Sequence, residues 1–129
     1  MKYAKIASLV FFMAFASAPI CPVAAETRIT EIENVYVKHG DKAAITACGQ
    51  LNNGSGWTDI DAEYLYFAVS DSKGEEILNK IEKISFWEGN ASINIDTNNL
   101  APGNYTIHVK FMGNKYLHPS ESYTTLVVM

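Results

Sequence analysis

The sequence predicts an all-β fold, an antiparallel β-sandwich of about seven strands that follows a signal peptide. Two observations carry this prediction. The first is strict alternation after Tyr105, where apolar side chains occupy every second position as far as Phe111; a period of two is typical of a strand with one buried face and one solvated face. The second is that several short alternating segments are separated by turn residues about every 8 to 12 positions, which is typical of sandwiches.

The N-terminal segment is typical of a secretory signal peptide. Two lysines precede residues 6–16, which are apolar apart from one serine, and Pro19 and Pro22 follow. We predict cleavage after Ala25, so that residues 26–129 form one domain. A retained membrane anchor is the alternative, but the apolar run is shorter than the roughly 20 residues that a spanning helix needs. The predicted location is therefore secreted or in the cell envelope, without membrane insertion after cleavage.

The composition and charge of the chain argue against some classes of binding partner. The 129-residue chain has a formal net charge of −4, and loss of the two N-terminal lysines makes the exported part more acidic. An acidic protein is a poor partner for nucleic acid or an anionic membrane. After cleavage Cys48 is the remaining cysteine, which excludes an intrachain disulfide. It either fills space in the sheet or pairs with another chain.

The first half of the domain predicts three strands. Residues 27–37 form the first, whose apolar spacing slips between Ile29 and Ile32 and so indicates a bulge or a division between two sheets. After a turn at 39–41, residues 42–49 form the second, with Ile45 and Ala47 facing inward. Residues 51–61 contain Asn-Asn-Gly-Ser-Gly and predict an irregular loop. Residues 63–70 form the third strand, with the following inward side chains: Leu65, Phe67 and Val69.

The second half begins with a turn at 71–74 and an ambiguous segment at 75–87. Its apolar residues fall at helical spacing, but a sandwich of this size favours strands, with Ile77 in one and 84–86 in the next. After a turn at 88–90, a further strand carries three inward side chains: Ala91, Ile93 and Ile95. Residues 122–128 form the last strand, in which Thr124, Leu126 and Val128 are opposed to Tyr123, Thr125 and Val127.

The segment before the penultimate strand predicts a tyrosine corner. Pro102 and Gly103 make a tight turn, because proline fixes its own φ and glycine tolerates a positive one. Tyr105 follows at the head of the strand, where the tyrosine of such corners bonds back to the upstream backbone.

The chain resembles the bacterial and archaeal immunoglobulin-like domains of surface and adhesin-type proteins. The resemblance covers nearly the whole exported part. Its blocks are Lys38-His39-Gly40-Asp41-Lys42, Leu65-Tyr66-Phe67-Ala68-Val69, Gly89-Asn90-Ala91-Ser92-Ile93-Asn94-Ile95, and Leu100-Ala101-Pro102-Gly103-Asn104-Tyr105 continuing to Pro119-Ser120. The resemblance implies a two-sheet immunoglobulin-like sandwich that serves in cell-surface proteins, and it brings no catalytic residues.

Three acidic residues are the candidate metal ligands. Asp59, Asp61 and Glu63 alternate before the third strand, where their carboxylates would share one face and attract calcium. The alternative is a solvated acidic edge. No further cofactor is predicted, because nothing in the sequence brings the three histidines together. An enzyme is not expected, because no nucleophile motif or phosphate-binding glycine loop occurs.

The candidate binding residues are aromatic. Trp57 in the glycine-rich loop, with Tyr64 and Tyr66 on the outward side of the third strand, would offer a large contact area at low ordering cost. The alternative for Trp57 is to cap the core. We expect a non-catalytic module that contacts a protein or a glycan at the cell surface. The second hypothesis is a structural subunit that self-associates through an edge strand such as 122–128.

Overall fold

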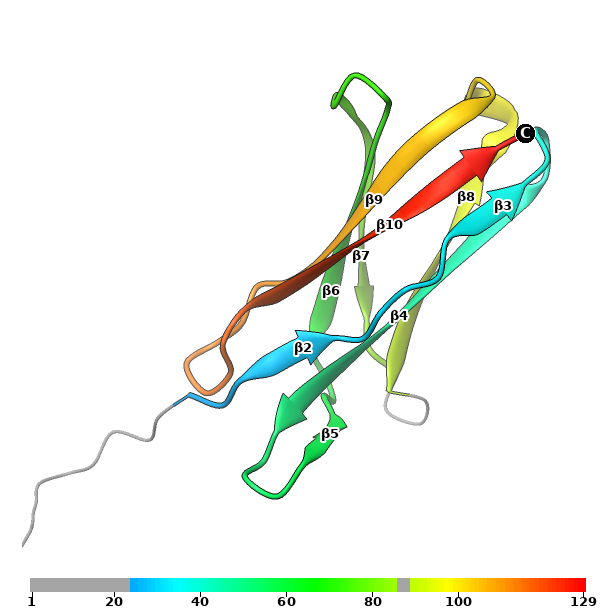
Figure 1. The fold of residues 1–129 in the computed structure, drawn as a ribbon. Coiled ribbons are helices and arrows are strands. Elements are labelled where there is room, and N and C mark those ends of the chain that lie inside the picture. Colours follow the sequence, from blue (N-terminus) through cyan, green and yellow to red (C-terminus); the bar gives the residue numbers. More distant parts are fainter. Residues whose placement is uncertain (1–23, 86–88) are drawn as a thin grey trace, which may run out of the picture.

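The protein is a two-layer immunoglobulin-like β-sandwich (Figure 1). The structure is a computed structural model that describes residues 24–85 and 89–129, so most of the predicted signal peptide lies outside the described residues. Within them the strands are β2 (Thr27–Ile29), β3 (Val35–Val37), β4 (Lys42–Asn52), β5 (Trp57–Asp59), β6 (Tyr64–Ser70), β7 (Glu76–Lys83), β8 (Asn90–Asp96), β9 (Gly103–Phe111) and β10 (Ser120–Val128). A short 3₁₀ helix spans Thr97–Asn99. No helix among the described residues has the length and apolar character needed to cross a membrane.

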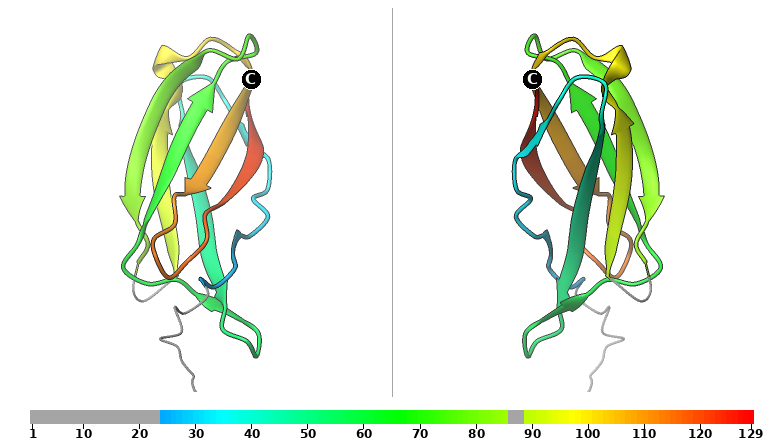
Figure 2. Two further views of the ribbon diagram at one scale, coloured as in Figure 1. Left: turned by 90° about the vertical axis from the view of Figure 1, so that its left-hand side faces the viewer. Right: turned by 90° about the vertical axis from the view of Figure 1, so that its right-hand side faces the viewer.

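The strands form two sheets that face each other across the core (Figure 2). One sheet has five strands in the order β3-β10-β9-β6-β7. The other is built around β4, which pairs with β8 along its first half and with β2 and β5 near its end. All pairs are antiparallel except β3 with β10, which is parallel. The described residues contain nine strands, more than the predicted number of about seven, because the first predicted strand is divided into β2 and β3 and because β5 was not predicted.

Of the two alternatives for the first strand, a bulge or a division between two sheets, the structure has the division. β2 pairs with β4 in one sheet, and β3 pairs with β10 in the other. Ile32 in the crossing segment is 8% exposed and belongs to the core. The Asn34 side chain, just before β3, accepts a hydrogen bond from the backbone N–H of Thr125 at 3.3 Å. β10 is therefore paired on one side and partly covered on the other, so the proposal of 122–128 as a free edge strand is wrong.

Alternating side chains from both sheets form one core. The inward positions predicted for β4, β6, β8 and β9 are all buried, and on β10 the buried set is Thr124, Leu126 and Val128. Phe67 and Val69 on β6 lie opposite Val109 and Ile107 on β9, so the centre of the five-stranded sheet supplies much of the buried volume. Stability therefore comes from packing, and Cys48 is a half-buried free thiol on the outer side of β4.

The prediction of a loop over 51–61 is wrong at both ends. β4 continues to Asn52 and pairs with β5, so Trp57 lies in a strand opposite Asn52. The polar sequence closes a hairpin because the Asn53 side-chain oxygen accepts hydrogen bonds from the N–H groups of Ser55 and Gly56. The Asn53 N–H also donates to the Gly56 carbonyl at 3.0 Å. The Asn53 side chain thus makes the hydrogen bonds of a turn, and the segment forms a tight hairpin instead of an irregular loop.

The prediction of two strands within 75–87 is also wrong. β7 is one continuous strand that pairs with β6 along its length, which excludes the helical alternative. Leu78 faces the core while Ile77 and Ile81 are exposed, so apolar residues on both sides of one strand imitate a helical spacing. Ile84 is buried just after β7, and Phe86 lies outside the described residues.

The tyrosine corner is confirmed. The Tyr105 hydroxyl donates a hydrogen bond to the Ala101 carbonyl at 2.6 Å, across the bend at Pro102. Gly103 begins β9 with a φ of 153°, at the limit of the region that side chains avoid. The corner therefore fixes how the chain crosses from β8 into β9.

Replacing Tyr105 with phenylalanine tests this corner. The ring stays buried, but the Ala101 carbonyl loses its donor, so we expect the free energy of unfolding to fall by about 1–2 kcal/mol. Urea denaturation of both proteins measures the difference. Thr106→Ala is a matched control, since Thr106 lies next to Tyr105 and is exposed; an equal loss in the control would contradict a specific role for the hydroxyl.

Candidate binding surface

The outer face of the five-stranded sheet gathers large apolar and aromatic side chains. Five of them are well exposed: Tyr36 (64%), Tyr64 (50%), Tyr66 (39%), Ile81 (53%) and Tyr123 (60%). They come from β3, β6, β7 and β10, and each occupies an outward position in its strand's alternation. We call these five residues the tyrosine face.

The strand register brings these side chains side by side. Tyr66 lies opposite Ile81 on β7 and opposite Lys110 on β9. Tyr123 lies opposite His108, and the two rings stack with centroids 4.2 Å apart and planes within 8°. Directly opposite residues of neighbouring strands are close enough to touch, so Tyr66 adjoins Ile81 and Tyr123 adjoins His108. Tyr36 lies opposite Val127, farther along β10.

The His108 ring holds the middle of the tyrosine face in place. Its Nε2 donates a hydrogen bond to the Glu121 carboxylate at 2.6 Å, while Tyr123 covers one side of the ring. Ala68 lies opposite His108 on β6 and leaves room beside it. The Tyr123 and His108 rings are thus held against each other before any partner arrives, which lowers the entropy cost of binding there.

The outer face of the other sheet has a different character. Its exposed positions on β4 and β8 carry small or polar side chains, among them Thr46, Ser92 and Asn94. The hydroxyls of Thr46 and Ser92 hydrogen-bond each other at 2.8 Å. The two faces therefore differ in what they can bind, and most of the exposed tyrosines in the strands lie on the five-stranded sheet.

Trp57 is not part of the tyrosine face. It lies on β5 in the other sheet, whereas Tyr64 and Tyr66 lie on β6, so the predicted grouping of the three is wrong. The Arg28 guanidinium carbon is 4.1 Å from the centroid of the Trp57 ring, and Arg28 Nε donates to Gln50 at 2.8 Å. Trp57 is 38% exposed and does not pack on the core, so it does not act as a cap either.

The acidic residues do not converge. Asp59 lies on β5 opposite Gln50, whereas Asp61 and Glu63 lie in the link to β6. Within residues 24–85 and 89–129, no group of three or more His, Cys, Asp or Glu side chains is arranged to hold a metal ion. The calcium site predicted from the sequence spacing is therefore not supported, because the three residues do not share one strand.

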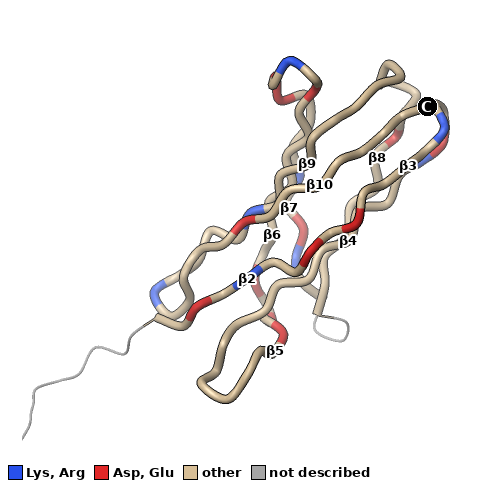
Figure 3. The backbone as a smooth tube through the Cα atoms, viewed as in Figure 1, with Lys and Arg blue, Asp and Glu red and all other residues tan. Residues whose placement is uncertain are grey.

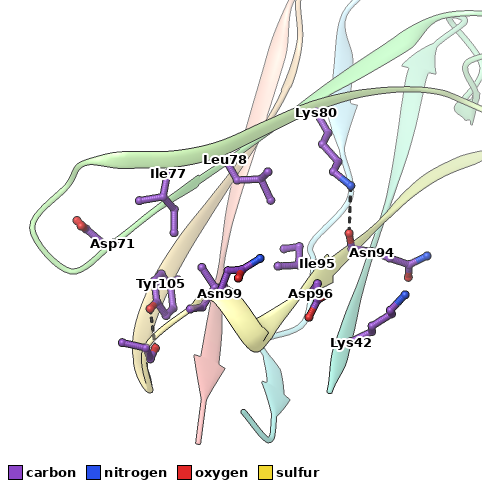
Figure 4. A pocket seen from close by; sticks show the side chains of 12 residues that line it. Lys42, Asp71, Ile77, Leu78, Lys80, Asn94, Ile95, Asp96, Asn99 and Tyr105 are labelled. Carbon is purple, nitrogen blue, oxygen red and sulfur yellow. Dashed lines mark hydrogen bonds between the residues drawn. The ribbon is translucent and has the colours of Figure 1, made fainter. Parts of the chain in front are cut away.

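A cavity opens at the side of the sandwich, where β7 and β8 are the outermost strands (Figure 4). Its volume is about 660 Å³. Ile77 and Leu78 form an apolar wall, and the Lys80 ammonium reaches across to the Asn94 carbonyl at 3.3 Å. The sequence does not predict this cavity, because its lining comes from separate segments of the chain.

Charged residues of both signs are spread along the chain (Figure 3). Beside the tyrosine face they include Lys110 and Glu121, which lie opposite each other on β9 and β10, and Lys83, which lies opposite Tyr64. The surface is therefore mixed in sign and mainly aromatic, which is the composition of protein-binding surfaces rather than of nucleic-acid-binding ones.

Comparison with known proteins shows the fold. No family model and no curated protein sequence matches the chain. Among solved structures, it is similar to a tetra-tandem repeat in the extending region of a large adhesion protein, at 15% identity, a TM-score of 0.53 and 82% coverage of this chain. It is also similar to part of a family 123 glycoside hydrolase from Clostridium perfringens that hydrolyses glycolipid glycans, at 12% identity, a TM-score of 0.52 and 83% coverage. The chain spans about a quarter of each structure, 24% and 27%.

Proposed function

We propose that this protein is a non-catalytic, exported interaction module that binds a partner protein at the cell surface through the tyrosine face. One observation carries the proposal: the five-stranded sheet exposes Tyr64, Tyr66 and Tyr123 on its outer face, whereas β4 and β8 of the other sheet expose small or polar side chains. Monomeric soluble proteins rarely keep a contiguous aromatic patch without using it.

The chemistry of the face favours a protein over a glycan. Tyrosines offer a broad apolar ring and one polar hydroxyl, and they dominate the centres of protein interfaces. The five residues lie across several strands of one sheet, not around a hollow. A flat surface of this kind suits another folded surface, whereas small ligands bind in concave sites.

Two further points support an extracellular role. The N-terminal sequence predicts export, and a similar solved structure is a repeat from a large adhesion protein. The similarity to a quarter of a glycoside hydrolase indicates a shared sandwich and carries no activity to this chain, since its identity is 12%. The non-catalytic part of the proposal rests on the lack of a nucleophile motif in the sequence.

The test is a surface variant in which Tyr64, Tyr66 and Tyr123 are changed to serine. The labelled protein is titrated onto intact cells of its source, before and after protease treatment of the cells. We expect the wild type to bind saturably and protease treatment to abolish binding. Loss of three central tyrosines should weaken the apparent affinity at least about 100-fold, since interface tyrosines each contribute 1 kcal/mol or more.

The matched control changes the opposite face, with Thr46 and Asn94 replaced by alanine. It should bind like the wild type, and all three proteins should unfold cooperatively. Equal binding by the tyrosine variant and the wild type would refute the role of the tyrosine face. Binding that survives protease but is lost after deglycosylation would assign the partner to the glycan class.

A further inference from the structure

β7 is an edge strand, so the backbone N–H and C=O groups on one of its sides have no neighbouring strand among the described residues to pair with. It has eight residues, and within the described part of the chain it pairs only with β6. Figure 2 shows it at the margin of the molecule. The opposite edge of the same sheet ends in β3, which has three residues. Long regular edges are ready templates for pairing with another strand, and natural proteins usually shorten or cover them.

The direction of the backbone groups follows from one hydrogen bond. The Ile84 N–H donates to the Glu63 carbonyl on the β6 side at 2.8 Å. In an antiparallel pair, successive residues direct their N–H and C=O groups alternately to the two sides. The backbone groups of Asn79, Ile81 and Lys83 therefore point away from β6, toward the free edge.

We infer that β7 pairs antiparallel with β7 of a second copy of this chain, with Ile81 opposite Ile81. Outward-pointing backbone groups of Ile81 then form two hydrogen bonds across the twofold axis. In this register Lys80 lies directly opposite Glu82 of the second copy, and the symmetry repeats the pair. Asn79 lies opposite Lys83 of the second copy, so no like charges face each other.

Charge selects this register over its neighbours. Centring the pair on Lys80 places the two Lys80 side chains opposite each other. Centring it on Asn79 places Glu76 opposite Glu82 twice. Like charges directly opposite each other destabilise a strand pair, whereas opposite charges stabilise it. Shifting the register by a single residue would pair outward side chains of one copy with inward side chains of the other. The inner face of one copy would then lie on the outer side of the joint sheet.

The inferred dimer also joins the two tyrosine faces. Ile81 lies opposite Tyr66 within each copy, and the axis passes between the two Ile81 side chains. The outer faces of both five-stranded sheets would then form one continuous surface. This inference goes beyond the proposed function and can be tested without any partner.

The first test is sedimentation velocity of the purified protein over a range of concentrations. Edge pairing buries a small area, so we expect a weak dimer that dissociates on dilution. Lys80→Glu and Glu82→Lys each turn two attractive pairs into repulsive ones, which should weaken the dimer about tenfold or more. An equimolar mixture of the two variants restores both attractions, so a heterodimer should form at least as tightly as the wild-type dimer.

A second test locates the axis. Ile81→Cys in a Cys48→Ser background places two thiols opposite each other at a Cα separation of about 5.5 Å, within disulfide range. Asn79→Cys is the matched control, since Asn79 is exposed on the same side of β7 as Ile81 but lies away from the axis. We expect a disulfide dimer from the first variant at concentrations where the second remains monomeric.

Three results would overturn the inference: a wild-type monomer at about 1 mM, a dimer that neither charge variant weakens, or equal cross-linking at 79 and 81. Lys80→Glu also removes the bond to Asn94, so its thermal unfolding is measured in parallel. Glu82→Lys, whose side chain is exposed, keeps the test valid if Lys80→Glu unfolds.

Discussion

Phe67→Ala is expected to lower the free energy of unfolding by about 3–5 kcal/mol, the largest effect of any single change considered for this protein. Phe67 is 1% exposed at the centre of the five-stranded sheet, opposite Val109 on β9. Truncation leaves a cavity that the neighbouring strands cannot fill, because they are fixed by ladders on both sides of β6. Guanidinium denaturation measures the change in the midpoint.

Tyr66→Ala is the matched control for Phe67→Ala. It removes a ring from the adjacent residue of the same strand, but that ring points outward. The expected loss is at most about 1 kcal/mol, which is the range of strand propensity. Equal losses in the two variants would mean that the inward and outward assignments of β6 are wrong.

The inward side chains of the fold could be predicted from the sequence because the period of two survives in most strands. Leu65, Phe67 and Val69 are buried as expected, and so are Ala91, Ile93 and Ile95. The tyrosine corner could also be predicted, since Pro102-Gly103 sets the turn and Tyr105 follows at a fixed distance. These features depend on residues close together in the sequence, which is the information that an alternating pattern or a turn motif contains.

The elements that escaped prediction depend on contacts that a periodic pattern does not report. β7 has apolar residues on both faces, so its sequence alone imitates a helix until β6 is placed beside it. β5 exists because Asn53 closes a hairpin, although the surrounding composition indicates a loop. The parallel pairing of β3 with β10 joins segments from opposite ends of the domain.

The candidate site could be predicted only in part for the same reason. Tyr64 and Tyr66 were identified because they alternate with buried residues of one strand. Tyr36 lies between two valines and Tyr123 between Ser122 and Thr124. Joining them to Tyr66 requires the strand order β3-β10-β9-β6. Trp57 was misplaced because the loop that was expected to carry it is a hairpin of the other sheet.

Thr97 carries the second large expected effect, because it is a fully buried polar residue that joins two turns. It is 0% exposed in the 3₁₀ helix between β8 and β9. Its hydroxyl accepts a hydrogen bond from the Gly40 N–H at 2.8 Å and donates to the Asp41 carbonyl at 2.5 Å. Gly40 has a φ of +99°, so the turn between β3 and β4 depends on glycine for its shape and on Thr97 for its hydrogen bonds.

Thr97→Val should therefore lower the free energy of unfolding by about 1–3 kcal/mol, the cost of leaving buried polar groups without partners. Valine has nearly the same shape, so the loss reports the hydroxyl and not a cavity. Thr97→Ser keeps the hydroxyl and loses one methyl group, and we expect it to be the more stable variant. Urea midpoints decide between them: if the serine variant is less stable than the valine variant, packing at Thr97 outweighs its hydrogen bonds to the β3–β4 turn.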